Sequence, residues 1–176
     1  MGIHRNRSGA RYEKDDNSEQ WFKGYLSVSH ASICFSGAMR KKVLLYVEDE
    51  DAAVFLLETA LREADIEVEL CRVSDGEQAL AFLTHSAGFE KVPRPNLILL
   101  DLNLPRKNGL EVLAEIFESD SLREIPVIVF TSSSLATDRK RSLALGARHY
   151  ITKPSTFDGF LDAVRKACSH LAENVG

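Results

Sequence analysis

The sequence lacks most of the features that mark specialised classes of protein. Its three cysteines, Cys34, Cys71 and Cys168, are too few and too widely spaced for a disulfide framework or a zinc site. No apolar run approaches the roughly 18 residues that a membrane-spanning helix needs. Basic residues number 22 against 26 acidic ones, whereas domains that bind nucleic acid phosphates are normally basic overall. We therefore expect a cytoplasmic protein that neither enters a membrane nor binds DNA directly.

The composition is that of an ordinary globular protein, and its 176 residues suit a single domain. A regular apolar pattern begins only after Met39. Residues 1–39 mix charges of both signs and carry little periodicity, which predicts an N-terminal extension that is disordered or weakly structured. We hypothesise that residues 1–38 are a non-essential tail; an upstream mis-called start, with Met39 as the true opening, is the stronger form of this hypothesis. The folded domain is expected over residues 40–174.

Short apolar runs alternate with amphipathic segments from residue 43 onward. The runs predict strands at residues 43–47, 66–72, 97–100, 126–130 and 148–152. A helix is expected after each strand, because apolar residues then recur at intervals of three and four. Continuously apolar strands are typical of a parallel sheet that is covered by helices on both faces. The pattern therefore predicts an α/β fold of the flavodoxin-like doubly wound (βα)5 type, with strand order 2-1-3-4-5.

Three helix ends carry signals in the sequence. Ser74 with Glu77 is expected to form a capping box at the start of the second helix. Ser155 with Asp158 is expected to cap the last helix, whose apolar stripe would begin at Phe157. The fourth helix is expected over residues 137–145, where the following Gly146 would end it.

Polar residues stand where the predicted strands end, which is the edge at which open parallel sheets bind ligands. They are Glu48, Asp49, Asp101, Thr131 and Lys153. Strands 1 and 3 are neighbours in the predicted order, so the three acids would share one pocket. Two like charges about 4 Å apart repel by on the order of 4 kcal/mol at an effective dielectric constant near 20, so a cation must compensate. Oxygen ligands suit Mg²⁺, and acids, a lysine and a hydroxyl together describe a site for a phosphoryl group.

Each of these residues has a simpler explanation when it is taken alone. Asp49 or Asp51 could cap the helix that follows, and Asp101 could form a turn. Thr131 could be an ordinary hydroxyl at a strand end, and Lys153 a solvated charge. The convergence of all of them on one edge of the sheet favours the phosphoryl site.

Over residues 41–171 the sequence resembles the receiver domain of two-component response regulators. The resemblance is carried by Glu48-Asp49, Asp101, Thr131 and Lys153-Pro154, by the loop from Asp101 to Gly109, and by Gly146-Ala147. The run from Pro93 to Pro105 is similar, more narrowly, to single-domain regulators associated with phytochrome kinases.

The resemblance implies that Asp101 is the phosphoacceptor, which becomes an acyl phosphate. It also implies that Mg²⁺ is held by Asp49 and Asp101, with Glu48 helping directly or through water. The backbone carbonyl of Asn103 would be the remaining ligand from the protein. Many receivers have aspartate at the position of Glu48, so the longer side chain leaves its contact with the metal open.

The resemblance assigns the remaining residues to binding and switching. Lys153 would pair with Asp101 at rest and with a phosphoryl oxygen afterwards, next to a cis peptide bond before Pro154. Thr131 would donate a hydrogen bond to the phosphoryl group, and Tyr150 would turn inward when Thr131 moves. Alternatively, Tyr150 is only a half-buried aromatic residue of a strand. The output would be a change on the surface of the fourth helix, fifth strand and fifth helix.

The implied partner is a histidine kinase, phytochrome-type on the narrower similarity, or a phosphotransfer protein. Only 22 residues follow Pro154, so no output domain is expected, and docking on a partner or on a second copy would carry the signal. Such a protein is not an enzyme but assists its own phosphorylation and dephosphorylation. The alternative is a receiver-like docking module that works without phosphorylation. A flavin carrier is disfavoured by the acids after the first strand, and an aspartyl phosphatase by Asn103.

Overall fold

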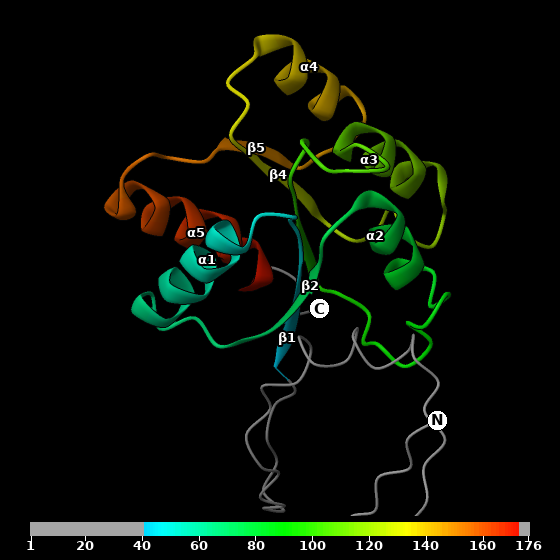
Figure 1. Ribbon diagram of the computed structural model, residues 1–176, viewed down its shortest axis with the longest axis horizontal. Coiled ribbons are helices and arrows are strands. Elements are labelled where there is room, and N and C mark those ends of the chain that lie inside the picture. The colour runs from blue at the N-terminus through cyan, green and yellow to red at the C-terminus, as the bar shows by residue number, and fades with distance from the viewer. Residues whose placement is uncertain (1–40, 173–176) are drawn as a thin grey trace, which may run out of the picture. The chain divides into compact units, whose positions relative to one another are not determined.

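The computed structural model describes residues 41–172, and these form five strands that alternate with five helices (Figure 1). In chain order the elements are β1 (Lys42–Val47), α1 (Asp51–Glu63), β2 (Val68–Val73), α2 (Gly76–Leu83), β3 (Leu97–Leu100), α3 (Gly109–Glu118), β4 (Val127–Thr131), α4 (Ala136–Ala144), β5 (His149–Thr152) and α5 (Phe157–Ala172). The extension predicted over residues 1–39 lies outside the described residues. Within the described part, no helix is long and apolar enough to cross a membrane.

The five strands are parallel and lie in the order β2-β1-β3-β4-β5, which confirms the predicted fold. The register sets where the strands end. Val47 pairs with Leu100, so the residues that follow β1 and β3 leave the sheet side by side. Thr131 pairs with Thr152, which brings the end of β4 level with the end of β5. Segments far apart in the sequence therefore meet at one edge of the sheet.

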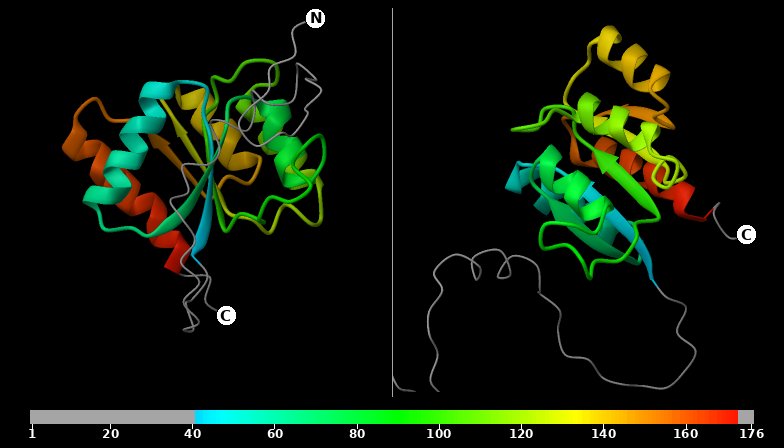
Figure 2. Two further views of the ribbon diagram at one scale, coloured as in Figure 1. Left: turned by 60° about the horizontal axis from the view of Figure 1, so that its bottom comes forward. Right: turned by 90° about the vertical axis from the view of Figure 1, so that its right-hand side faces the viewer.

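Helices cover both faces of the sheet, as the apolar strands predict. α1 and α5 lie on one face, and α2, α3 and α4 lie on the other (Figures 1 and 2). Successive side chains of β1 alternate between two cores: Leu44 and Tyr46 pack with α1 and α5, whereas Leu45 and Val47 pack with α2 and α3. A strand that is buried on both sides leaves polar residues no place except its ends.

β2 begins two residues later than the sequence predicts. The amide of Ile66 donates to the carbonyl of Leu61 at 2.9 Å, so it completes the end of α1 and is not available to the sheet. Asp65 makes this closure possible with a φ of 55°, in the left-handed region. The apolar side chain of Ile66 still packs on the α1–α5 side, and this produced the alternating pattern.

The two predicted capping pairs are wrong by one residue each. The residue that caps α2 is Asp75, whose side chain accepts a hydrogen bond from the amide of Gln78 at 2.8 Å. The carboxylate is also paired with the guanidinium of Arg106 at 2.9 Å, which favours it over the neighbouring Ser74. At the start of α5, the hydroxyl of Thr156 accepts from the amide of Gly159 at 3.3 Å, where Ser155 was expected.

Two helices at the β5 side of the sheet differ in how firmly they pack. Of the predicted apolar stripe of α5, Phe160, Val164, Cys168 and Leu171 are buried and Leu161 is partly buried, but Phe157 is 39% exposed and lies outside the core. α4 buries only Ser142 among its described residues, and both Leu143 within it and Leu135 just before it are exposed. Gly146 follows α4 with a φ of 107°, as the predicted helix end requires.

Replacing Gly146 with alanine is expected to lower the free energy of unfolding by about 3 kcal/mol in urea denaturation. The positive φ strains any residue with a Cβ atom, and this Cβ would lie 2.5 Å from the ring of Phe117. Gly88→Ala is the matched control, because its φ is 96° but no atom lies within 4 Å of the added methyl group. The control should lose about 1 kcal/mol, and equal losses would contradict the role of Phe117.

Candidate functional site

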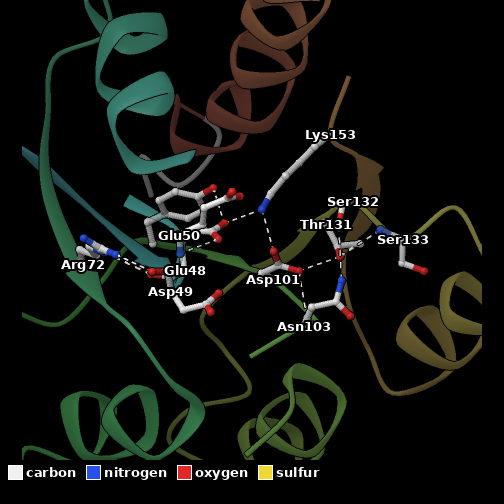
Figure 3. A network of polar contacts seen from close by, with 11 residues as sticks. Glu48, Asp49, Glu50, Arg72, Asp101, Asn103, Thr131, Ser132, Ser133 and Lys153 are labelled. Atoms are coloured by element: carbon white, nitrogen blue, oxygen red, sulfur yellow. Dashed lines mark hydrogen bonds and ion pairs between the residues drawn. The ribbon is translucent and has the colours of Figure 1, made fainter. Parts of the chain in front are cut away.

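The residues predicted at the strand ends lie together at the carboxyl edge of the sheet (Figure 3). Glu48 and Asp49 directly follow β1, and Asp101 directly follows β3. Thr131 is the last residue of β4, and Lys153 directly follows β5. The strand order and register are the only reason that positions up to 105 residues apart in sequence come into hydrogen-bond contact.

The ammonium group of Lys153 joins two buried carboxylates. Its Nζ donates to Oε2 of Glu48 at 2.5 Å and to Oδ2 of Asp101 at 2.6 Å (Figure 3). The side chain of Glu48 is 1% exposed and that of Asp101 is 6% exposed, so water screens neither charge effectively. One cation is thus shared by two acids, and the three side chains carry one net negative charge.

Asp101 accepts further hydrogen bonds at its other oxygen. Oδ1 accepts from the hydroxyl of Thr131 at 2.7 Å and from the amide of Asn103 at 3.1 Å. The bond from the amide of Asn103 is the turn contact that the simpler explanation of Asp101 predicted. Asp101 makes this contact in addition to its ion pair with Lys153. Burial raises the pKa of Asp101, but the hydrogen bonds and charge of Lys153 together with the Thr131 hydroxyl outweigh burial and hold the pKa below its ordinary value. Asp101 is therefore ionised at neutral pH.

Lys153 also remains charged in this buried position. Burial lowers its pKa, yet the hydrogen bonds to Asp101 and Glu48 outweigh burial and raise the pKa above its ordinary value. The structure thus brings a carboxylate and an ammonium together in their charged forms, with a hydroxyl on the opposite oxygen of the carboxylate. An ionised carboxylate can attack an electrophile, and the neighbouring ammonium of Lys153 can neutralise the negative charge of the group that is added.

Tyr46 is a member of the site that the sequence analysis missed. Its hydroxyl donates to Oε2 of Glu48 at 2.7 Å, and the amide of Glu50 donates to Oε1 at 3.2 Å. Burial and the carboxylate of Glu48 raise the pKa of Tyr46, so the phenol keeps its proton and remains a donor. A signal was present in the sequence, because side chains two residues apart on a strand share a face.

Arg72 is a second residue that the sequence analysis missed. It lies near the end of β2, opposite Tyr46 in the register, and its guanidinium donates to the loop between β1 and α1. Finding it from sequence would have required the register between β1 and β2.

The acids in the loop after β1 do not cap α1. The N-cap residue is Glu50, and its side chain makes no capping hydrogen bond. Asp49 has an exposed side chain, and Asp51 pairs with Arg72. The simpler explanation of these residues as helix caps is therefore wrong.

The donors at this edge fit a divalent cation with oxygen ligands. The exposed carboxylate of Asp49 lies beside Glu48 and Asp101, the two carboxylates that bind Lys153, and Asn103 adjoins Asp101 (Figure 3). Among residues 41–172, no three acidic, histidine or cysteine side chains form a metal cluster by themselves. Mg²⁺ does not need one, because it is bound through one or two carboxylates and keeps several waters. A direct contact of Glu48 with the metal stays a prediction.

Thr131 and Tyr150 both contact the loop that follows β4. The amide of Ser133 donates to Oγ1 of Thr131 at 3.3 Å, and the hydroxyl of Tyr150 donates to the carbonyl of Ser133 at 2.8 Å. Tyr150 is buried, and the guanidinium of Arg139 in α4 lies 5.6 Å from the centre of its ring. The alternative of a half-buried strand aromatic does not describe this side chain, which links the site to α4.

The peptide bond before Pro154 is trans, so the predicted cis bond is wrong. The amide of Lys153 donates to the carbonyl of Thr131 at 2.7 Å and continues the contact between β4 and β5 beyond the last paired residues. This bond aligns Lys153 with the site, and the side chain reaches both carboxylates with the trans geometry that is intrinsically preferred.

Three comparisons with known proteins agree on one family. A sequence model of the response regulator receiver domain matches residues 44–165. The response regulator Rcp1 of Synechocystis is 42% identical over 134 residues, which cover 76% of this chain and 91% of that protein. The crystal structure of the Mn²⁺-bound form of Rcp1 aligns with a TM-score of 0.70 and 42% identity, over 77% of this chain and 97% of the other.

A second solved structure is similar to the same extent. The phosphorylated cyanobacterial phytochrome response regulator RcpA aligns with a TM-score of 0.71 and 36% identity, over 78% of this chain and 98% of the other. The region matched by the family model contains every residue labelled in Figure 3.

Replacing Lys153 with methionine is expected to lower the free energy of unfolding at pH 7 by about 3 kcal/mol in urea denaturation, because two carboxylates remain buried without their cation. The depressed pKa of Asp101 gives the wild type stability that is present above the unfolded pKa and lost as the pH falls through the folded pKa. In the variant that lacks Lys153, burial raises the pKa of Asp101, so protonation of this carboxylate at lower pH removes the cost of the unpaired buried charge. The difference between the two proteins should therefore narrow from pH 7 toward pH 4.

Lys107→Met is the matched control for this variant. The ammonium of Lys107 pairs with Glu115, which is 47% exposed, so its removal should cost far less and show no such pH dependence. Equal losses in the two variants at pH 7 would contradict the role given to the buried ion pair.

Proposed function

The chain belongs to the response regulator receiver domain family, and from this premise we propose that it accepts a phosphoryl group on Asp101. The donor is a phosphohistidine of a histidine kinase or of a phosphotransfer protein. The observation that carries the proposal is the state of Asp101, which is buried and ionised between Lys153 and Thr131.

The reaction follows from these contacts. An oxygen of the Asp101 carboxylate attacks phosphorus, and the bond between phosphorus and the histidine nitrogen breaks. The leaving imidazole keeps the electron pair and takes up a proton, and Asp101 becomes a mixed anhydride. Lys153 neutralises charge on the transferred group, and Thr131 exchanges its hydrogen bond to Asp101 for one to a phosphoryl oxygen. Phosphoryl transfer depends mainly on positioning and on charge stabilisation, which these residues supply.

A divalent cation completes the site in this proposal. Asp49, Asp101 and the backbone carbonyl of Asn103 would hold Mg²⁺, which neutralises negative charge on the phosphoryl oxygens when it is bound. The Mn²⁺-bound form of Rcp1 supports a divalent ion in this family. The protein is then not an enzyme acting on a separate substrate, but it assists its own phosphorylation and dephosphorylation.

The output of phosphorylation passes through the loop after β4. Thr131 and Tyr150 both bond to Ser133, so a new partner for Thr131 changes the balance of conformations in this loop. α4 packs weakly and shows Leu135 and Leu143 to solvent, which makes it the element that can respond. The surface formed by α4, β5 and α5 then presents the signal to a partner or to a second copy of the chain.

The kinase proposed as partner is of the phytochrome type. RcpA is a phytochrome response regulator, and it matches this chain over 98% of its own length. Rcp1, at 42% identity, covers the same region. Direct binding of DNA is not part of this proposal. A docking module that works without phosphorylation is the alternative, and the next experiment separates the two.

Replacing Asp101 with asparagine should abolish phosphoryl incorporation from a radiolabelled phytochrome-type kinase, because the amide is not a nucleophile for phosphorus. Asp120→Asn, which removes an exposed acid paired with Arg123, should leave incorporation unchanged. Labelling of Asp101→Asn at the wild-type rate would place the acceptor elsewhere. Stable binding of the wild type to the kinase with no labelling at all would favour the docking module.

A further inference from the structure

The loop between β1 and α1 consists of three acids, Glu48, Asp49 and Glu50, and a fourth acid, Asp51, begins α1; one side chain from β2 binds this segment. Nε of Arg72 donates to the backbone carbonyl of Glu48 at 3.1 Å. Nη2 donates to the backbone carbonyl of Asp49 at 3.1 Å, and Nη1 donates to Oδ1 of Asp51 at 2.6 Å. All three nitrogens of one guanidinium thus donate to this segment, two to loop carbonyls (Figure 3) and one to the first residue of α1.

These contacts fix the backbone on both sides of Asp49. Two of the acceptors are the carbonyls of consecutive peptide units, and a planar guanidinium holds its donors in one fixed arrangement. The helix that follows supplies no side-chain cap to do the same work. The amide of Glu48 donates to the carbonyl of Val73 at 2.9 Å, which anchors the start of the loop, and the amide of Glu50 donates to Oε1 of Glu48 at 3.2 Å across the turn at Asp49. Arg72 adds the bonds to the two peptide carbonyls on either side of Asp49, which hold the direction of its exposed carboxylate.

The positive charge of Arg72 and its hydrogen bonds to the loop have opposite effects on the affinity of the site for a metal ion. A positive group beside a cation site repels the cation, so a residue that served only as a counter-charge for the acids would weaken metal binding. A residue that orients a ligand strengthens metal binding, and the loss of such a support typically weakens affinity by about 10- to 100-fold. The two roles thus predict effects of opposite sign when the charge is removed.

We propose that Arg72 is the positioning residue for the divalent cation, because it locks the peptide units around Asp49 and aims that carboxylate at the site of Asp101. The inference rests on the proposed function, since the cation site is part of it. The guanidinium of Arg72 contacts Asp51 and the carbonyls of Glu48 and Asp49, so its effect on the carboxylate of Asp49 passes through the backbone of the loop.

The test is a titration of the full chain with Mn²⁺, with free Mn²⁺ followed by electron paramagnetic resonance. Arg72→Lys keeps the charge but loses the fork of donors, and Arg72→Met loses both. Each variant should bind Mn²⁺ at least about tenfold more weakly than the wild type. The loss should persist in 0.5 M salt, which screens long-range charge effects.

Arg123→Met is the control for net charge. Arg123 precedes β4 and so lies at the amino edge of the sheet, away from the site, and its removal should leave Mn²⁺ affinity unchanged. Amide hydrogen exchange without metal gives a readout that does not depend on the cation: the amide of Glu50 should exchange faster in both Arg72 variants. Urea denaturation of Arg72→Lys establishes that the variant is folded.

The outcomes are distinct. Weaker binding by both Arg72 variants, with faster exchange in the loop, supports the proposal. Unchanged binding by Arg72→Lys together with tighter binding by Arg72→Met would show that Arg72 is only a counter-charge, and would overturn it. Unchanged binding by both variants would overturn it as well. If the wild type and Asp49→Asn bound Mn²⁺ equally, the proposed cation site itself would be wrong, which is a separate failure.

Discussion

The ammonium of Lys153 lies between the buried carboxylates of Glu48 and Asp101, and the chemistry of the site depends on this contact. Without the ammonium of Lys153, burial would favour the protonated acid, and Asp101 could not act as the nucleophile of the proposed reaction. With it, Asp101 stays ionised although it is 4% exposed. The same contact leaves the cluster with more negative than positive charge, so it is suited to a further cation. Glu48 thus serves the site by holding Lys153, and Tyr46 serves it by holding Glu48.

The order of the strands in the sheet brings Lys153 next to Glu48 and Asp101. The order β2-β1-β3-β4-β5 places β1 next to β3 and β4 between β3 and β5, so the ends of these parallel strands adjoin at one edge. Because the central strands β1, β3 and β4 are buried on both faces, the buried acids of the site lie at the end of these strands. Residues that are not part of the site fix the loops that carry its side chains. Arg72 holds the loop after β1, and the pair of Asp75 with Arg106 holds the loop after β3 against α2.

Much of this arrangement could be predicted from the sequence, because apolar runs locate buried strands and parallel topology makes their ends converge. Asp101, Thr131 and Lys153 follow from that argument. Tyr46 and Arg72 do not, since their roles depend on which side chains the register places face to face. The helix caps were misplaced because neighbouring Ser, Thr and Asp residues compete, and a distant partner such as Arg106 decides between them. The bond from the amide of Lys153 to the carbonyl of Thr131, next to the trans peptide before Pro154, joins two strands, and no local pattern contains it.

The most direct measurement of the central claim is a crystal structure of the chain with Mg²⁺ and beryllium fluoride, which imitates a phosphoryl group on a carboxylate. The account predicts beryllium bonded to an oxygen of Asp101, with Nζ of Lys153 and Oγ1 of Thr131 within hydrogen-bond distance of its fluorines. It also predicts Mg²⁺ between Asp49 and Asp101. Beryllium on another carboxylate, or Lys153 still bridging Glu48 and Asp101 with the fluorines out of reach, would contradict it.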